Sequence, residues 1–306
     1  MATSASQVQR PLAAESGVAQ EPSWLSNFAN YLRRNPAMIA GILVLLSLVA
    51  FEIVGLLSVD IQRARPLSAR VLQPPGPGLP FGSDRNGRDL FAAAVAGIPM
   101  TFRIGLIAGL LGISIGTVLG FFSAYYGGVV DTVIKTVVDV GLTIPGLMVL
   151  IIIATSFRGG LTVEQMALVV AILAWLHPTR TIRAQVLTMK ERAYIQVARL
   201  SGVSGPRIIF TELMPNLLSY LAAGSVNAVS SAILASIGLE ALGLGPMDSP
   251  TLGMTVYWVI YFGALINGWW WWWLPPIVLI SLLFIGLFLV SLGLDELANP
   301  RRRHLV

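Results

Sequence analysis

Few residues of this sequence have the type and spacing that covalent chemistry requires. The pattern Gly112-Ile113-Ser114-Ile115-Gly116 formally matches the G-x-S-x-G motif, in which a serine acts as nucleophile. That motif needs a turn between a strand and a helix, and a histidine base, for which His177 is the internal histidine. The pattern lies instead inside an apolar run that favours a helix. An intramembrane serine hydrolase using Ser114 and His177 is therefore an alternative that the context argues against.

The sequence also lacks the residues of an ATP-hydrolysing site. Its two lysines, Lys135 and Lys190, do not follow the glycine-rich P-loop pattern. The absence of cysteine excludes disulfides and thiolate metal ligands, and His177 and His304 cannot form a helix-borne zinc motif. We therefore expect no catalytic residue, metal or cofactor in this chain, so that any energy from ATP enters through another polypeptide.

The polar segment Ser83–Asp89 offers oxygen ligands at Asp84, Asn86 and Asp89. These could form a cation site, but the later glutamate of the EF-hand pattern is missing. A tight turn at Asn86-Gly87 that caps a helix beginning near Asp89 explains the same residues, and we favour it.

The composition is that of a membrane-embedded protein. Hydrophobic residues make up 55% of the chain and charged residues 11%, against about 25% charged in soluble proteins. The net charge of +5 comes from arginines that lie between apolar runs rather than on one soluble face, which argues against nucleic-acid binding.

We predict an all-α membrane protein with six transmembrane helices. A ~30 Å hydrocarbon layer requires roughly 20 apolar residues, and backbone groups in lipid must be paired within the segment. The predicted spans are residues 37–59, 100–125, 132–156, 165–175 with a continuation, 217–245 with a break at 243–246, and 274–294.

Lysine and arginine placement orients these spans. With both termini in the cytoplasm, 13 of the 20 basic residues lie inside and 7 outside. Trp24, Phe28 and Leu32 recur at helical spacing before the first span and predict an interfacial helix. The predicted organisation is a disordered cytoplasmic tail (1–23), the interfacial helix with the first span (24–59), an external loop (60–99), a core of five spans (100–296) and a basic cytoplasmic tail (297–306).

A polar, basic segment at about 181–216 separates two of the apolar runs. We expect a helix that ends at Gly202, followed by a second short helix closed by Pro215. Two short helices of this kind would present a rigid knob to a soluble partner. The candidate contact residues are Tyr194, Gln196, Ala198, Arg199, Gly202, Arg207 and Pro215.

This segment resembles the EAA loop of ABC-importer permeases. The triplet reads Gln196-Val197-Ala198 instead of Glu-Ala-Ala, and Met214-Pro215 stands in place of Leu-Pro. Across residues 33–303 the chain resembles the dipeptide/oligopeptide permease family, and within it the C-type subunit. The matching motifs are Asn35-Pro36, residues 81–89, residues 126–131, Asp139 with Pro145, Arg180 with Arg183, residues 207–209 and residues 242–245.

The resemblance implies the type I ABC-importer permease architecture and a set of partners. These are a homologous permease subunit, two ABC ATPase subunits or domains that carry ATP and Mg, and an external solute-binding protein. It also implies a multi-pass protein of the bacterial or archaeal cytoplasmic (inner) membrane. A peptide is the expected solute, and an oligosaccharide stays open because aromatic rings stack on sugars.

Two features near the outer ends of the last spans are candidates for contact with the solute or the binding protein. Glu240 is an ionisable residue inside an apolar run, where charge is costly and indicates function. Trp269–Trp273 form a run of five tryptophans, with Trp258 upstream. We favour an interfacial belt for the run and keep Trp269, Trp270 and Trp258 as candidate contacts.

Small and charged residues predict two packing features. Gly105 with Gly109, and Ala108, Gly112, Gly116 and Gly120, follow helical spacing and predict a close contact with a neighbouring helix or a second permease chain. Lys135 lies four residues from both Asp131 and Asp139, so local ion pairs can form; we favour a solvated cytoplasmic end of the third helix.

Overall fold

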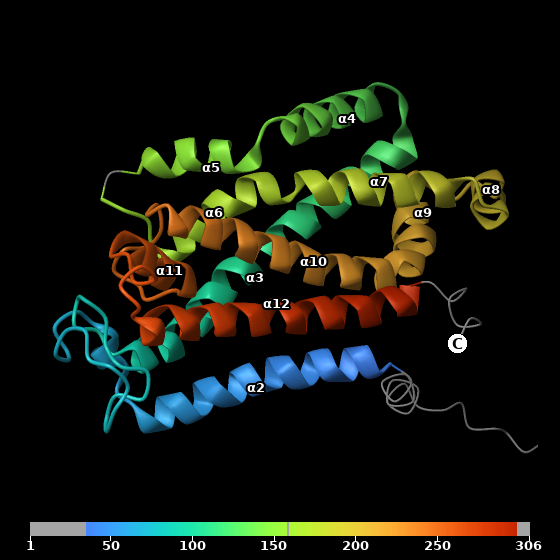
Figure 1. Cartoon of the computed structure of the whole chain (residues 1–306). Coiled ribbons are helices and arrows are strands. Elements are labelled where there is room, and N and C mark those ends of the chain that lie inside the picture. Colours follow the sequence, from blue (N-terminus) through green and yellow to red (C-terminus); the bar gives the residue numbers. More distant parts are fainter. Residues whose placement is uncertain (1–34, 158, 299–306) are drawn as a thin grey trace, which may run out of the picture.

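A computed structural model of the chain describes residues 35–157 and 159–298, and all its named elements are helices (Figure 1). Their bounds in chain order are α2 (Pro36–Ser58), the 3-10 helix η1 (Ile61–Ala64), α3 (Leu90–Tyr126), α4 (Gly128–Thr143), α5 (Gly146–Thr155), α6 (Val163–Ala174), α7 (Leu176–Lys190), α8 (Ala193–Leu200), α9 (Gly205–Ile208), the π-helix η2 (Ile209–Leu213), α10 (Met214–Ala241), α11 (Leu252–Tyr261) and α12 (Trp270–Ala298). The predicted tail 1–23, the interfacial helix and residues 299–306 lie outside the described ranges.

The helices run side by side between two ends of the molecule (Figure 1). One end, called the loop end below, holds residues 59–89 and 242–269, including η1 and α11. The other, called the α8 end, holds α8 and α9, and α2 begins and α12 ends there (Figure 1).

Four helices of the described part are long and apolar enough to cross a membrane. They are residues 36–58, 90–126, 205–241 and 270–296, and the pair α4–α5 makes a fifth if it counts as one span. These long apolar helices agree with the prediction of an all-α membrane protein. The helices α6 and α7, with 12 and 15 residues, are too short to qualify separately, so six spans remain a prediction.

The structure corrects the second and third predicted spans. The second helix begins at Leu90, next to the cap predicted at Asp89, so ten residues assigned to the external loop (90–99) are helical. The third span is broken at Pro145 into α4 and α5, which bend by 83°. A proline has no N–H to donate and disfavours helix at the residue before it, which is why Ile144 is extended.

The fourth and fifth spans also differ in detail. Thr162 and Gln165 form a capping box at the start of α6, and the helix continues after Trp175 as α7, as the predicted continuation requires. Helix α10 ends at Ala241, just before the break predicted at residues 243–246. The helix α11 was not predicted.

Helix α3 packs through its small residues onto other helices of the same chain. Gly109 contacts the backbone of α10, because a Cβ there would lie 2.6 Å from the Cα of Val229. Gly116 contacts α7, where a Cβ would lie 2.6 Å from the Cβ of Pro178. The predicted packing face is confirmed, and its partners are α10 and the α6–α7 segment.

Candidate functional site

The segment between α7 and α10 folds against the α8 end of the bundle. Ile195 of α8 and Ile208 of α9 are fully buried in a cluster with Phe121 of α3 and Ile182 of α7. Ala198 and Val203 pack against the same cluster. The short helices are therefore attached to the bundle core through one apolar face.

Gly202 ends α8 in a left-handed conformation, with φ of 75°. The N–H of Gly202 donates to the carbonyl of Arg199 at 3.0 Å, and that of Val203 donates to Ala198 at 3.1 Å. This pair of bonds is a Schellman motif, which satisfies the last carbonyls of a helix and favours glycine. The prediction that a helix ends at Gly202 is confirmed.

The opposite face of α8 is open and mixes apolar with basic side chains. Leu200 is 89% exposed and Val197 61%, and Tyr194 is also exposed. Arg199 stacks over Tyr125 of α3 at 5.0 Å. Within the described residues, neither Arg192, Arg199 nor Arg207 forms an ion pair. This surface suits an apolar partner that brings carboxylates.

The sequence predicts a second short helix that is closed by Pro215, and this prediction is wrong. Helix α9 passes through η2 into α10, and Pro215 sits in the first turn of α10, where its missing N–H is tolerated. The N–H of Met214 donates to Ile209 in the π-helical pattern, and the side-chain amide of Asn216 donates to the carbonyl of Glu212 at 2.6 Å. The α8–α9 segment thus continues directly into the long helix α10.

The remaining predicted coupling residues differ in their surroundings. Gln196 is half-buried and donates through Nε2 to the carbonyl of Lys190 at 3.4 Å, which links α8 to the end of α7. Arg207 is exposed.

An ion pair joins α7 to the first turn of α4. The guanidinium of Arg183 donates from Nε to Oδ1 of Asp131 at 2.5 Å and from Nη2 to Oδ2 at 2.6 Å. Ser123 donates to the same Oδ1, and Lys190 donates to the carbonyl of Ala124 at 2.9 Å. Lys135 is exposed, which agrees with the favoured solvated helix end, and Asp131 pairs instead with a residue 52 positions away.

A cavity of about 590 Å³ lies between α3, α4, α5, α6, α7, α10 and α12. Its lining is mostly apolar, with a few polar groups that include His177, Tyr220, Asn227 and Asp295. The amide oxygen of Asn227 accepts from Ser291 of α12 at 2.9 Å. A concave, mainly apolar cavity with few polar groups is typical of small-molecule sites. Sequence spacing does not reveal it, because its walls come from seven helices.

Ser114 does not share this cavity with His177. It is exposed within helix α3, whereas the preceding residue, Ile113, lines the cavity. The G-x-S-x-G pattern therefore lies in a continuous helix and not at the turn that a nucleophilic serine requires.

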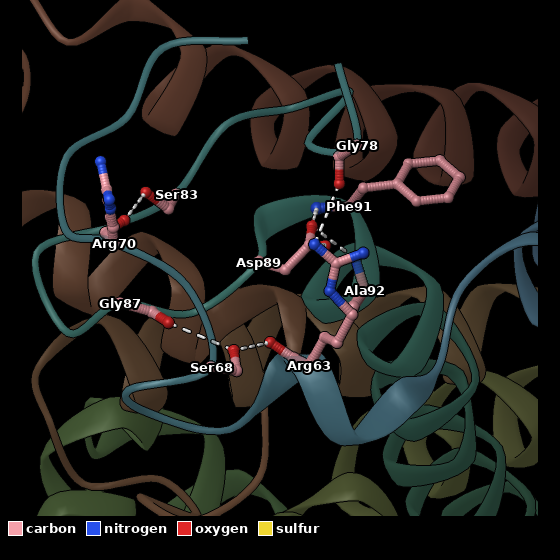
Figure 2. A network of polar contacts seen from close by, with 9 residues as sticks. All are labelled: Arg63, Ser68, Arg70, Gly78, Ser83, Gly87, Asp89, Phe91 and Ala92. Carbon is pink, nitrogen blue, oxygen red and sulfur yellow. Dashed lines mark hydrogen bonds and ion pairs between the residues drawn. The ribbon is translucent and has the colours of Figure 1, made fainter. Parts of the chain in front are cut away.

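At the loop end, Ser83–Asp89 form a turn and a helix cap (Figure 2). Oδ1 of Asp84 accepts the N–H groups of Asn86 and Arg88, both at 2.8 Å. Oδ1 of Asp89 accepts from Phe91 and Ala92 at the start of α3, and its Oδ2 lies 3.3 Å from Arg63. The favoured interpretation as a capping turn is confirmed.

Burial changes the pKa of Asp84. The side chain is 2% exposed, and this burial raises the pKa of its carboxyl, while hydrogen bonds from backbone N–H groups act in the opposite direction. Arg63 also donates to the carbonyl of Gly78 at 2.9 Å, so the loop is held by bonds between distant residues (Figure 2).

The tryptophan run forms a small core rather than a continuous belt. Trp272 is fully buried with Leu90 and Val259, and Trp269 and Trp258 are half-buried around them. Only Trp270 of the five has an exposed ring, at 52%. The belt interpretation is therefore wrong for Trp272, whose ring joins α12 to α3 and α11.

Glu240 is enclosed at the junction of α10 and α11. It is 0% exposed, its Oε2 accepts from the hydroxyl of Thr251, and its Oε1 has no hydrogen-bond partner among the described residues. A Cβ at Gly245 would lie 2.5 Å from its Cγ, so glycines make room for it. In this structure Glu240 joins the two helices, and its contact with a solute stays a prediction.

The chain is similar to known transport proteins. A family model described as "Binding-protein-dependent transport system inner membrane component" matches residues 116–304, which include the α8–α9 segment. The oligopeptide transport system permease protein OppC of Mycobacterium bovis is 32% identical over 175 residues, 57% of this chain and 60% of that protein. The aligned region thus spans less than two thirds of that relative.

Two further relatives align over more of the chain. The dipeptide transport system permease protein DppC of Bacillus subtilis is 30% identical over 246 residues, which cover 76% of this chain and 76% of that protein. The DppC protein of Haemophilus influenzae is 28% identical over 236 residues, 75% of this chain and 79% of that protein.

Proposed function

Because this chain belongs to the family of binding-protein-dependent transport system inner membrane components, we propose that it is a permease subunit of an ATP-driven importer of short peptides. The relatives named above are permeases of oligopeptide and dipeptide transport systems, which supports the choice of solute. Its partners are a homologous permease chain, two ABC ATPase subunits or domains and an external solute-binding protein. The chain itself carries out no catalysis.

The observation that carries this proposal is the α8–α9 knob. Its inner face is buried through Ile195 and Ile208, while Leu200 is 89% exposed next to Arg199, which forms no ion pair within the described part of the chain. An exposed leucine costs solvation free energy unless a partner covers it. An ATPase subunit with an apolar groove and acidic rim fits this surface.

Movement of the α8–α9 segment would be transmitted to the cavity through the helices on either side of it. Helix α7 leads into α8, η2 continues into α10, and both α7 and α10 line the cavity of about 590 Å³. The pair Asp131–Arg183 makes α4 move with α7. Closure of the ATPases would therefore change the shape of the cavity, which is the solute path of this subunit. Alternating access of this kind needs two discrete packings of the same helices.

The aromatic run does not favour an oligosaccharide over a peptide. Trp272 is fully buried and stacks on Trp269 at a centroid distance of 6.0 Å, so its ring is unavailable to stack on a sugar face. Peptide import is the function that we retain.

The α8 end faces the cytoplasm in this proposal, and the chain crosses the inner membrane six times with both termini inside. The basis is the count of 13 basic residues inside against 7 outside. Ser68→Cys at the loop end should react with an impermeant thiol reagent in intact cells, whereas Ser201→Cys after α8 should react only in opened cells. Both serines are exposed. Labelling of the second variant in intact cells would reverse the orientation.

The function is tested with the assembled importer in proteoliposomes. Leu200→Asp and Gly202→Asp should insert normally but lose ATPase co-purification and ATP-dependent uptake of radiolabelled tri-alanine. Leu67→Asp is the matched control, because Leu67 is 86% exposed at the opposite end. It should retain the ATPase. Full ATPase retention and uptake by both knob variants would overturn the proposal.

A further inference from the structure

A second cavity, of about 480 Å³, lies at the loop end and has no role in the function proposed above. It is formed by η1, the start of α3 and the segment between α10 and α11. Its charged lining residues are Arg65, Arg88 and Asp248, and Ala96 and Met100 of α3 form part of its wall. With two arginines and one carboxylate, the lining is net positive.

The position of this cavity along α3 places it outside the hydrocarbon layer. Arg103 is about 34 Å from Tyr126 along the helix axis, at 1.5 Å per residue, which exceeds the ~30 Å hydrocarbon thickness. Ala96, Met100 and Arg103 lie on one face of α3. Arg103 pairs at 2.9 Å with Glu164, and both side chains are more than half exposed, as suits the membrane boundary. The cavity next to Met100 is therefore open to water-soluble solutes.

Arg88 is held in place but keeps an unused donor. Its guanidinium lies over the ring of Trp258 at 5.2 Å, and its backbone N–H donates to Asp84. Its Nε is buried and has no hydrogen-bond partner among the described residues. A buried donor without a partner is unfavourable, and such groups commonly mark a site that a ligand or water completes.

Two other arginines of this loop contact the protein itself. Arg63 contacts Asp89 and the carbonyl of Gly78, and Arg85 stacks over Phe262 at 5.5 Å. Arg65 and Arg88 have no ion pair within the described residues, yet both line the same cavity. Guanidinium groups are suited to binding a carboxylate, because their planar fork of donors matches two carboxylate oxygens.

We propose that this cavity binds the C-terminal carboxylate of a short peptide between Arg65 and Arg88, before the peptide enters the membrane path. Asp248 lines the same cavity and can accept the ammonium group of the peptide. The volume falls in the 300–1,000 Å³ range of small-molecule sites, whereas a protein surface usually binds through a wider and flatter area. The inference rests on peptide import as the function.

The probe is tri-alanine, compared with tri-alanine amide, which lacks the carboxylate. Binding is measured by isothermal titration calorimetry on this chain together with its partner permease in lipid nanodiscs. The amide should bind about tenfold more weakly, which is the loss expected for one charge-assisted hydrogen bond. Arg65→Ala and Arg88→Gln should each weaken binding of the acid by a similar factor, and neither should weaken binding of the amide further.

Arg85→Ala is the matched control, since Arg85 belongs to the same loop but does not line the cavity. It should bind acid and amide as the wild type does. Equal affinity of the wild type for acid and amide would overturn the site. So would variants that bind both peptides normally but lose the solute-binding protein, because the arginines would then meet a carboxylate of that protein. Failure of the proposed function is read separately, as absence of ATP-dependent uptake by the wild type.

Discussion

Replacing Gly109 by alanine is expected to force α3 and α10 apart. A Cβ at this position would lie 2.6 Å from both the Cα and the N of Val229, and 2.9 Å from the carbonyl carbon of Ala228. Carbon atoms in contact are normally about 3.5–4.0 Å apart, so the helices must separate by about 1 Å. The atoms concerned are backbone atoms, which cannot rotate away as a side chain would.

The expected loss of stability follows from two opposing terms. An extra methyl group in a well-packed contact costs about 1–3 kcal/mol. Alanine stabilises a helix relative to glycine by up to about 1 kcal/mol, but less here, because a helix in lipid keeps its backbone hydrogen bonds even when it separates from its neighbours. We expect Gly109→Ala to lower the free energy of unfolding by about 1–2 kcal/mol.

The control is Gly238→Ala in α10, another glycine inside a long helix. There the nearest atom to an added Cβ is the Cδ1 of Leu147, at 3.8 Å, so the methyl group fits. Unfolding is followed by circular dichroism during titration of mixed micelles with SDS. The midpoint should fall for Gly109→Ala and stay or rise for Gly238→Ala. Equal midpoints for the two variants would refute the reasoning.

Two further predictions use the same assay. Asp131→Ala and Arg183→Ala should each lower the free energy of unfolding, and the double variant should be no less stable than either single variant. The pair is bidentate and about one-fifth exposed, so we expect a coupling energy of about 1–2 kcal/mol. Additive losses would contradict the pairing. Trp272→Ala should cost about 3–5 kcal/mol because it empties a fully buried site, whereas Trp270→Ala, at a half-exposed ring, should cost less than about 1 kcal/mol. Similar losses for the two tryptophans would restore the belt interpretation.

Features that depend on a few neighbouring residues could be predicted from the sequence. The long apolar runs identified the helices, because a helix in lipid satisfies its own backbone. Gly202 identified the end of α8, since a left-handed residue after a helix favours glycine. Asp89 identified the start of α3 through its side chain, which accepts N–H groups two and three residues further on.

Features that join distant segments were decided by the tertiary structure. The spacing of Asp131 and Lys135 allowed a local pair, but Arg183 of another helix binds Asp131 with a bidentate geometry that Lys135 cannot offer. The tryptophan run looked like an interfacial belt because its neighbours were unknown; once α3 and α11 cover Trp272, burial of its ring is more favourable than exposure at the interface. Both cavities have walls from several helices, so their existence depends on packing that no single segment encodes.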